Sequence, residues 1–238
     1  MSGDNVSLLP DDALIGRLIA AERQCTVDWV QAIADLPGNP YRAAVRPFGG
    51  ATATVCGAIP AEVLNRVFGF RASDAELIGD IERTYAELGA APLFDIAPTT
   101  VTPFWEGPNV LRALARAGYY QAAFHQQLYC PLPVAATSPR PGGTDQGDVA
   151  VRIVGPDDAD TFGRLYASVW GDPGVALVWL GHPSFTCYIA SVDGTDAALG
   201  VLHITGGTAS MANALTTPAL RGRGCQTALL RRRLHDAA

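Results

Sequence analysis

The stretch that decides the fold runs from Thr216 to Leu230 and reads TTPALRGRGCQTALL. Its two glycines, Gly222 and Gly224, stand between a turn that contains Pro218 and a segment rich in Leu and Arg that predicts a helix. Because a strand is expected just before it, the chain passes from a strand through a glycine loop into a helix. Such a loop turns several backbone N–H groups toward one point, which is how many proteins bind a phosphate. The stretch therefore predicts a phosphate-binding loop.

Upstream of this loop the sequence predicts one strand, one helix and then three antiparallel strands. The expected strands are 149–154, 185–192, 197–205 and 209–216. Pro156 and the two acids that follow it are typical of the first turn of a helix. Asp193-Gly194 predicts a hairpin turn between the second and third strands, and Gly206-Gly207 predicts another turn after that.

The segment Arg221–Gln226 resembles the acyl-CoA pyrophosphate loop of the GCN5-related N-acetyltransferase family, whose motif is Arg/Gln-x-x-Gly-x-Gly/Ala. The resemblance implies an α+β (mixed α/β) fold with a central, mostly antiparallel sheet flanked by helices. It also implies acetyl-CoA as co-substrate and an amine as acceptor. The implied cofactor-binding residues are Leu215, Thr216, Arg221, Gly222, Arg223, Gly224, Cys225, Gln226 and Thr227. Gln226 departs from the motif, which has a small residue at that position.

The first half of the chain is expected to be a second, degenerate copy of the same domain. Residues 134–148 are rich in Pro, Gly and small polar residues and predict a linker between 1–133 and 149–238. In the first half we expect helices at 11–36 and 110–117, strands at 51–57, 63–68 and 93–97, and a final pair of strands within 119–132. The segment 109–119 resembles a later helix of the family, and this likeness suggests the duplication.

The counterpart of the glycine loop in the first half is 68–75, with a single glycine and an acid at the helix entrance. Asp74 is expected to repel a pyrophosphate there. Ser73 and Glu76 predict a capping box for the helix that follows. Only the second half is therefore expected to bind CoA.

The sequence does not identify a catalytic residue. His203 has a side chain with the pKa of a general base, but a partly buried histidine with a local hydrogen bond is the favoured interpretation. Cys225 is expected at a helix N-terminus, where the pKa of a thiol can be lowered. The favoured interpretation is that Cys225 is a small apolar residue that fills space in the core. Arg231, Arg232 and Arg233 are expected to spread around a solvated helix surface.

Composition narrows the class of protein further. The chain has 238 residues and a formal net charge of −6, which argues against a nucleic-acid-binding surface. No stretch approaches the roughly 20 apolar residues of a membrane-spanning helix. Five scattered cysteines without a C-x-x-C pair predict reduced thiols, no metal site and a cytoplasmic protein.

In the family that the loop resembles, the phosphate-binding helix is followed by a further strand, a helix and a hairpin, and usually by a Tyr that protonates the leaving thiolate. This sequence ends at Ala238, so we expect either that more chain follows in the source or that catalysis is lost. An open strand edge would then favour pairing with a second copy. Three functions stay open: an N-acetyltransferase acting on a small molecule or peptide amine, an inactive CoA- or ligand-binding protein, and an interaction protein.

Overall fold

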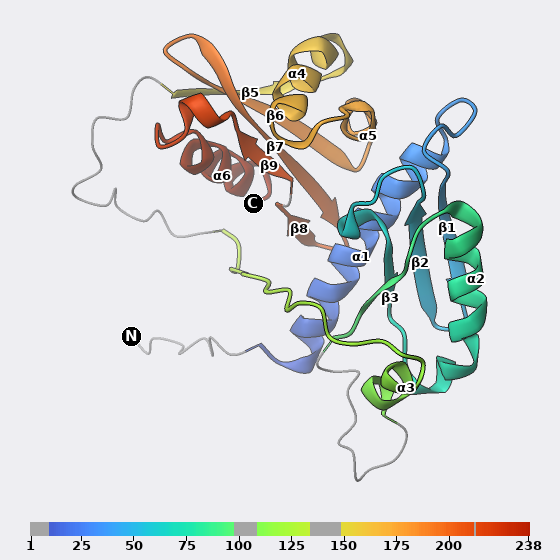
Figure 1. The fold of residues 1–238 in the computed structure, drawn as a ribbon. Coiled ribbons are helices and arrows are strands. Elements are labelled where there is room, and N and C mark those ends of the chain that lie inside the picture. Colours follow the sequence, from blue (N-terminus) through green and yellow to red (C-terminus); the bar gives the residue numbers. More distant parts are fainter. Residues whose placement is uncertain (1–9, 98–108, 134–148, 212) are drawn as a thin grey trace, which may run out of the picture. The chain divides into compact units, whose positions relative to one another are not determined.

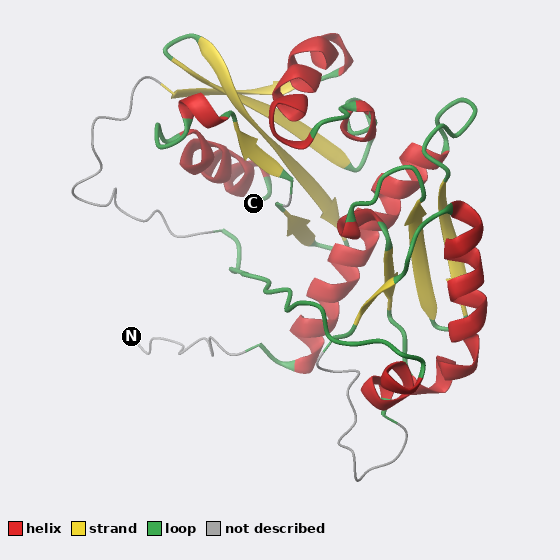
Figure 2. Ribbon diagram, viewed as in Figure 1, coloured by secondary structure: helices red, strands yellow, loops and turns green. Residues whose placement is uncertain are grey.

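The structure, a computed structural model, describes residues 10–97, 109–133 and 149–238 apart from residue 212. It divides into two compact units, 1–124 and 125–238, each with a sheet and flanking helices (Figures 1 and 2). The predicted linker 134–148 lies outside the described residues. Within the described parts of the chain, no helix combines the length and the apolar character needed to cross a bilayer.

The first unit is built on a four-stranded sheet in the order β1-β2-β3-β4. Its elements are α1 (Asp12–Ala34), β1 (Ala43–Phe48), β2 (Ala51–Cys56), β3 (Arg66–Phe68), α2 (Ile78–Leu88), β4 (Leu93–Asp95) and α3 (Val110–Arg116). The first three strands are antiparallel, and β4 joins parallel to β3. Helices α1 and α2 cover opposite faces of the sheet (Figure 1). Side chains alternate between the two faces of the sheet along β2. Ala51, Ala53 and Val55 therefore share one face, and they pack on the α2 side.

Two predictions for this unit are wrong and one strand was missed. The segment 119–132, all of it described, forms no strand, since it contains no Gly, Asn or Asp to make a tight hairpin turn. The 3₁₀ turn Ala72–Leu77 is capped at Arg71 and not at Ser73, because the Asp74 carboxylate accepts the backbone N–H of Arg71. Strand β1 was not expected, since Pro47 interrupts its sequence pattern.

The second unit is a five-stranded antiparallel sheet in the order β5-β6-β7-β8, with β9 also paired to β7. Its elements are β5 (Val149–Val154), α4 (Ala159–Trp170), α5 (Gly174–Leu177), β6 (Phe185–Val192), β7 (Thr195–Thr205), β8 (Thr208–Ser210), β9 (Ala214–Thr216) and α6 (Cys225–Asp236). Helices α4 and α6 lie on opposite faces of the sheet (Figure 2). The core under α6 joins Tyr188, Leu202 and Leu229. The predicted order of elements is confirmed in this unit.

The expected strand 209–216 is broken into β8 and β9 by an irregularity. Ser210 pairs with His203 and Ala214 pairs with Gly200, so the connecting stretch 211–213 is one residue longer than the part of β7 that it faces. After β9, the 3₁₀ turn Pro218–Leu220 leads into the glycine loop.

Candidate functional site

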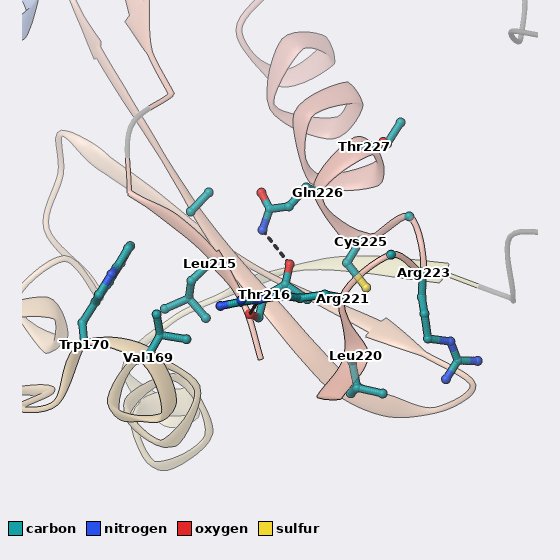
Figure 3. Close-up of a pocket in the computed structure, with 13 residues that line it drawn as sticks. Val169, Trp170, Leu215, Thr216, Leu220, Arg221, Arg223, Cys225, Gln226 and Thr227 are labelled. Atoms are coloured by element: carbon teal, nitrogen blue, oxygen red, sulfur yellow. Dashed lines mark hydrogen bonds between the residues drawn. The ribbon is translucent and has the colours of Figure 1, made fainter. Parts of the chain in front are cut away.

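A pocket of about 630 Å³ lies at the carboxyl end of β9, where the chain enters the glycine loop (Figure 3). All of the cofactor-binding residues predicted from the sequence line this pocket. Four further residues complete its lining: Val169, Trp170, Ala214 and Leu220. The volume is within the range of roughly 300–1,000 Å³ that is usual for small-molecule sites. The tertiary structure therefore gathers the predicted residues around one cavity.

The backbone of the loop leaves helix α6 open at its N-terminus. Gly222 and Gly224 have φ angles of 79° and 85°, in the left-handed region that glycine adopts without strain. Gly224 is the residue that precedes α6, and no side chain caps this fully described helix. The first N–H groups of a helix have no acceptor inside the helix, and they lie at the positive end of its dipole. This part of the pocket is suited to an anion.

The two arginines of the loop are engaged by the protein itself. Arg221 directs its Nε toward the carbonyl oxygen of Thr216 at 3.4 Å. Arg223 forms an ion pair with Asp193 in the β6–β7 turn, where both side chains are exposed. Exposed pairs of this kind contribute at most about 1 kcal/mol, so an anionic ligand can compete for Arg223.

Gln226, the position that departs from the family motif, reaches back toward β9. Its Nε2 donates to the Thr216 hydroxyl at 2.9 Å, across the pocket between α6 and the end of the strand (Figure 3). A Gly or Ala at this position would leave the space open. The side chain therefore narrows the space between α6 and the end of β9.

Cys225 is only 2% exposed, and burial raises the pKa of its thiol. A raised pKa is the opposite of what a reactive thiolate needs. Its side chain belongs to the apolar core under α6, together with Leu229. This environment agrees with the interpretation of Cys225 as a small apolar filler.

His203 lies in the core and not at the pocket. It is 1% exposed, and its ring centroid lies 4.9 Å from that of Phe185 on the neighbouring strand. It is absent from the pocket lining, as are Asp and Glu among the described lining residues. The structure thus places His203 in the core, packed against Phe185.

Sequence reasoning missed the wall that α4 contributes to the pocket. Val169 and Trp170 are the last two residues of that helix and precede Gly171. Trp170 is 48% exposed, which is unusual for so large an apolar side chain. A tryptophan directly before a glycine that ends a helix was the available sequence signal. Because Trp170 lies about 50 residues before the glycine loop, the sequence did not predict that both line one pocket.

In the first unit, the loop between β3 and α2 packs around the Asp74 carboxylate. Asp74 is 9% exposed, and its Oδ2 accepts the N–H of Arg71 at 2.9 Å. A β-carbon on Gly49 would lie 3.1 Å from the other oxygen of this carboxylate, so the backbone packs tightly around it. The Asp74 carboxylate thus fills the space beside these backbone groups.

Comparison with solved structures identifies the fold. No protein-family model matches this sequence, and no curated protein does. The GCN5-related N-acetyltransferase from Kribbella flavida superimposes with a TM-score of 0.59, at 12% identity over 94% of this chain and 80% of that one. The ribosomal-protein-S18-alanine N-acetyltransferase from Escherichia coli matches 37% of this chain at 13% identity and a TM-score of 0.34. That match spans 59% of the Escherichia coli chain.

The match over nearly the whole chain shows that this protein has the fold of the GCN5-related N-acetyltransferases. The predicted α+β fold class is thereby confirmed. A fold alone does not determine an activity, so the function has to be argued from the pocket.

Proposed function

We propose that residues 149–238 form an N-acetyltransferase domain that binds acetyl-CoA and transfers its acetyl group to an amine of a small molecule or peptide. The observation that carries the proposal is the uncapped N-terminus of α6, with Gly222 and Gly224 in left-handed conformations, opening into the pocket. The N–H groups of the loop would hold the pyrophosphate. The backbone of Leu215 and Thr216 would then hold the pantetheine arm along β9.

In this proposal the amine nitrogen attacks the thioester carbonyl directly. A C–N bond forms, the C–S bond breaks, and CoA leaves as a thiol after taking up the proton that the amine loses. Holding both reactants in one cavity supplies much of the rate in such a reaction. The side chains of the described pocket lining provide no base, so positioning is the contribution that this chain's own residues offer.

The two units have related orders of elements, which supports a duplication. In the first unit α1 is followed by three antiparallel strands, β1, β2 and β3, and then by α2. In the second unit α4 and the short α5 are followed by the antiparallel strands β6, β7, β8 and β9, the glycine loop and α6. We propose that 1–133 is a degenerate copy and that 149–238 is the ligand-binding one. The Asp74 carboxylate in the loop between β3 and α2 is the reason for this assignment.

Two matched glycines test the acetyl-CoA site. Gly222 and Gly207 both have a positive φ, 79° and 71°, and neither has an atom within 4 Å of an added β-carbon. Gly222 lines the pocket and Gly207 lies in the β7–β8 turn. Backbone strain is therefore similar in Gly222→Ala and Gly207→Ala, and only the first places a methyl group where the pyrophosphate would lie. The affinity for acetyl-CoA is measured by calorimetry on the whole chain. Gly222→Ala should lower this affinity about tenfold or more, and Gly207→Ala should leave it close to that of the unmodified protein. Equal affinities, or no binding by the unmodified chain, would reject the proposal.

The second candidate is a protein that binds acetyl-CoA without turnover. It is favoured by the absence of Asp, Glu and His from the described pocket lining and by the Gln226–Thr216 contact across the cavity. Release of CoA thiol in the presence of a panel of amines separates the two functions. Tight binding without thiol release on any amine would favour the second.

A further inference from the structure

The two ends of the pocket have different chemistry. Both charged side chains of its lining, Arg221 and Arg223, come from the glycine loop. At the other end, the lining is apolar and comes from the end of α4 and from β9: Val169, Trp170, Ala214 and Leu215. In Figure 3, Val169 and Trp170 lie on the far side of Leu215 and Thr216 from Arg223. The α4 side of the cavity is therefore apolar, whereas Arg221 directs its guanidinium toward Thr216 on β9 and Arg223 lies on the far side.

The ring of Trp170 is held in place although it is half exposed. Tyr166, one helical turn earlier, meets it edge to face with ring centroids 5.1 Å apart. Tyr166 is itself buried and packs against Trp179, which is fully buried. An exposed aromatic surface fixed by a buried neighbour gives up little conformational entropy when a ligand covers it. Such a surface on a cavity wall is what a recognition site needs.

We propose that Trp170, with Val169 and Leu215, forms the subsite for the body of the acceptor amine, and that this body is aromatic or bulky alkyl. This inference rests on the proposed function. With the pyrophosphate on the loop and the pantetheine along β9, the thioester lies toward the apolar end. The amine that attacks it must occupy the same end, against Trp170.

The charge of the lining excludes polycationic acceptors from this class. Among the described residues that line the pocket, Arg221 and Arg223 are cations and none is an acid. A polyamine would meet positive charge and no carboxylate, whereas a monoamine needs only one polar contact at the thioester and an apolar wall for the rest. Phenethylamine is therefore a suitable probe, and spermidine and ethanolamine are the contrasting ones.

Binding of these probes to the CoA-loaded chain tests the subsite. We expect phenethylamine to bind at least about tenfold more tightly than spermidine or ethanolamine. Trp170→Ala should weaken phenethylamine about five- to tenfold and leave the affinity for CoA within about twofold, and Trp170→Phe should recover most of the loss. Leu230→Ala is the control, because Leu230 is exposed to a similar degree, 45%, on α6 and does not line the pocket.

The outcomes separate this inference from the function on which it rests. If the unmodified chain binds CoA but shows no preference for phenethylamine, or if Trp170→Ala leaves that preference intact, the inference fails and the function stands. If Trp170→Ala changes only the affinity for octanoyl-CoA, the wall holds an acyl chain and the inference is wrong. If the unmodified chain binds no CoA, the proposed function fails, and the subsite fails with it.

Discussion

The guanidinium of Arg233 on α6 lies directly over Gly200 on β7, so close that a β-carbon built on Gly200 would be 3.2 Å from Cζ of the arginine. The arginine is 3% exposed and uses this position to donate to the carbonyl oxygens of Val201 and Met211, at 3.1 and 3.0 Å. Met211 belongs to the irregular stretch between β8 and β9. One side chain thus ties α6 to β7 and to Met211, which lies between β8 and β9.

Substitution of Gly200 should test this close approach. Gly200→Ala places a methyl group against the Arg233 guanidinium, and we expect a loss of about 1–3 kcal/mol in the free energy of unfolding, as for overpacked cores. Gly155→Ala is the control, because no atom lies within 4 Å of an added β-carbon there and its φ is negative. Urea denaturation measures both. A Gly200→Ala protein as stable as the Gly155→Ala protein would mean that the guanidinium moves aside freely.

Removal of the buried guanidinium should be more costly than removal of an exposed one. Arg233→Met deletes the donors to Val201, Met211 and Leu229 and leaves buried carbonyl oxygens without them. We expect a loss of about 2–4 kcal/mol in urea denaturation. The control is Arg231→Met on the same helix, at an exposed position, for which a change within about 0.5 kcal/mol is expected. Similar losses for the two variants would contradict a structural role specific to Arg233.

Shortening Gln226 should strengthen ligand binding. Gln226→Ala removes the side chain that crosses the pocket to the Thr216 hydroxyl, so we expect the dissociation constant for acetyl-CoA to fall about three- to tenfold, as measured by calorimetry. Thr216→Val keeps the shape of the strand residue but removes the hydroxyl, and should give a smaller gain. Weaker binding by Gln226→Ala would show instead that the amide contacts the ligand.

The cysteines should differ in reactivity toward alkylation. Cys225 is buried and its pKa is raised by that burial, and burial also raises the pKa of Cys187 to about 12. Cys130 is exposed. At pH 8 iodoacetamide should therefore modify Cys130 first and Cys225 at least about tenfold more slowly, as followed by mass spectrometry. Rapid modification of Cys225 in the folded protein would indicate a thiolate at the N-terminus of α6.

Acid should weaken the attachment of the C-terminal end of α6. Burial raises the pKa of Asp236, but hydrogen bonds from Arg232 and the Tyr188 hydroxyl lower it by more, so its net direction is downward. A carboxyl with a lowered pKa stabilises the fold above its unfolded pKa, near 4, and this contribution disappears as the pH falls through its folded pKa.

At pH 7 Asp236→Asn should therefore lower the free energy of unfolding by up to about 1 kcal/mol, and this difference from the unmodified protein should shrink as the pH falls below about 4. Tyr188→Phe removes the hydrogen bond from the Tyr188 hydroxyl to Asp236. It should lower the free energy of unfolding by less than Asp236→Asn does, with the same dependence on pH. Chemical denaturation across this pH range checks both. A difference that persists in acid would mean that the carboxylate charge has no part in it.

The elements around the glycine loop were predictable because their signals are local. The signals for a strand at 149–154, a hairpin turn at Asp193-Gly194 and a glycine loop at Gly222–Gly224 depend only on neighbouring residues. All three features appear in the structure as predicted. The residues that line the loop side of the pocket follow from the same local pattern. A strand pair within 119–132 was expected without such a turn signal, and the structure has none in that segment.

The sequence by itself therefore determined the loop, the order of elements around it and the class of fold. Only the tertiary structure decided that Trp170 faces the loop across a cavity, that Arg233 is buried over Gly200, and that His203 lies in the core away from the pocket. The physical reason is distance along the chain. Periodicity and turn signals act over a few residues, whereas burial and contact depend on which strands and helices pack together, and a single sequence carries no local record of that pairing.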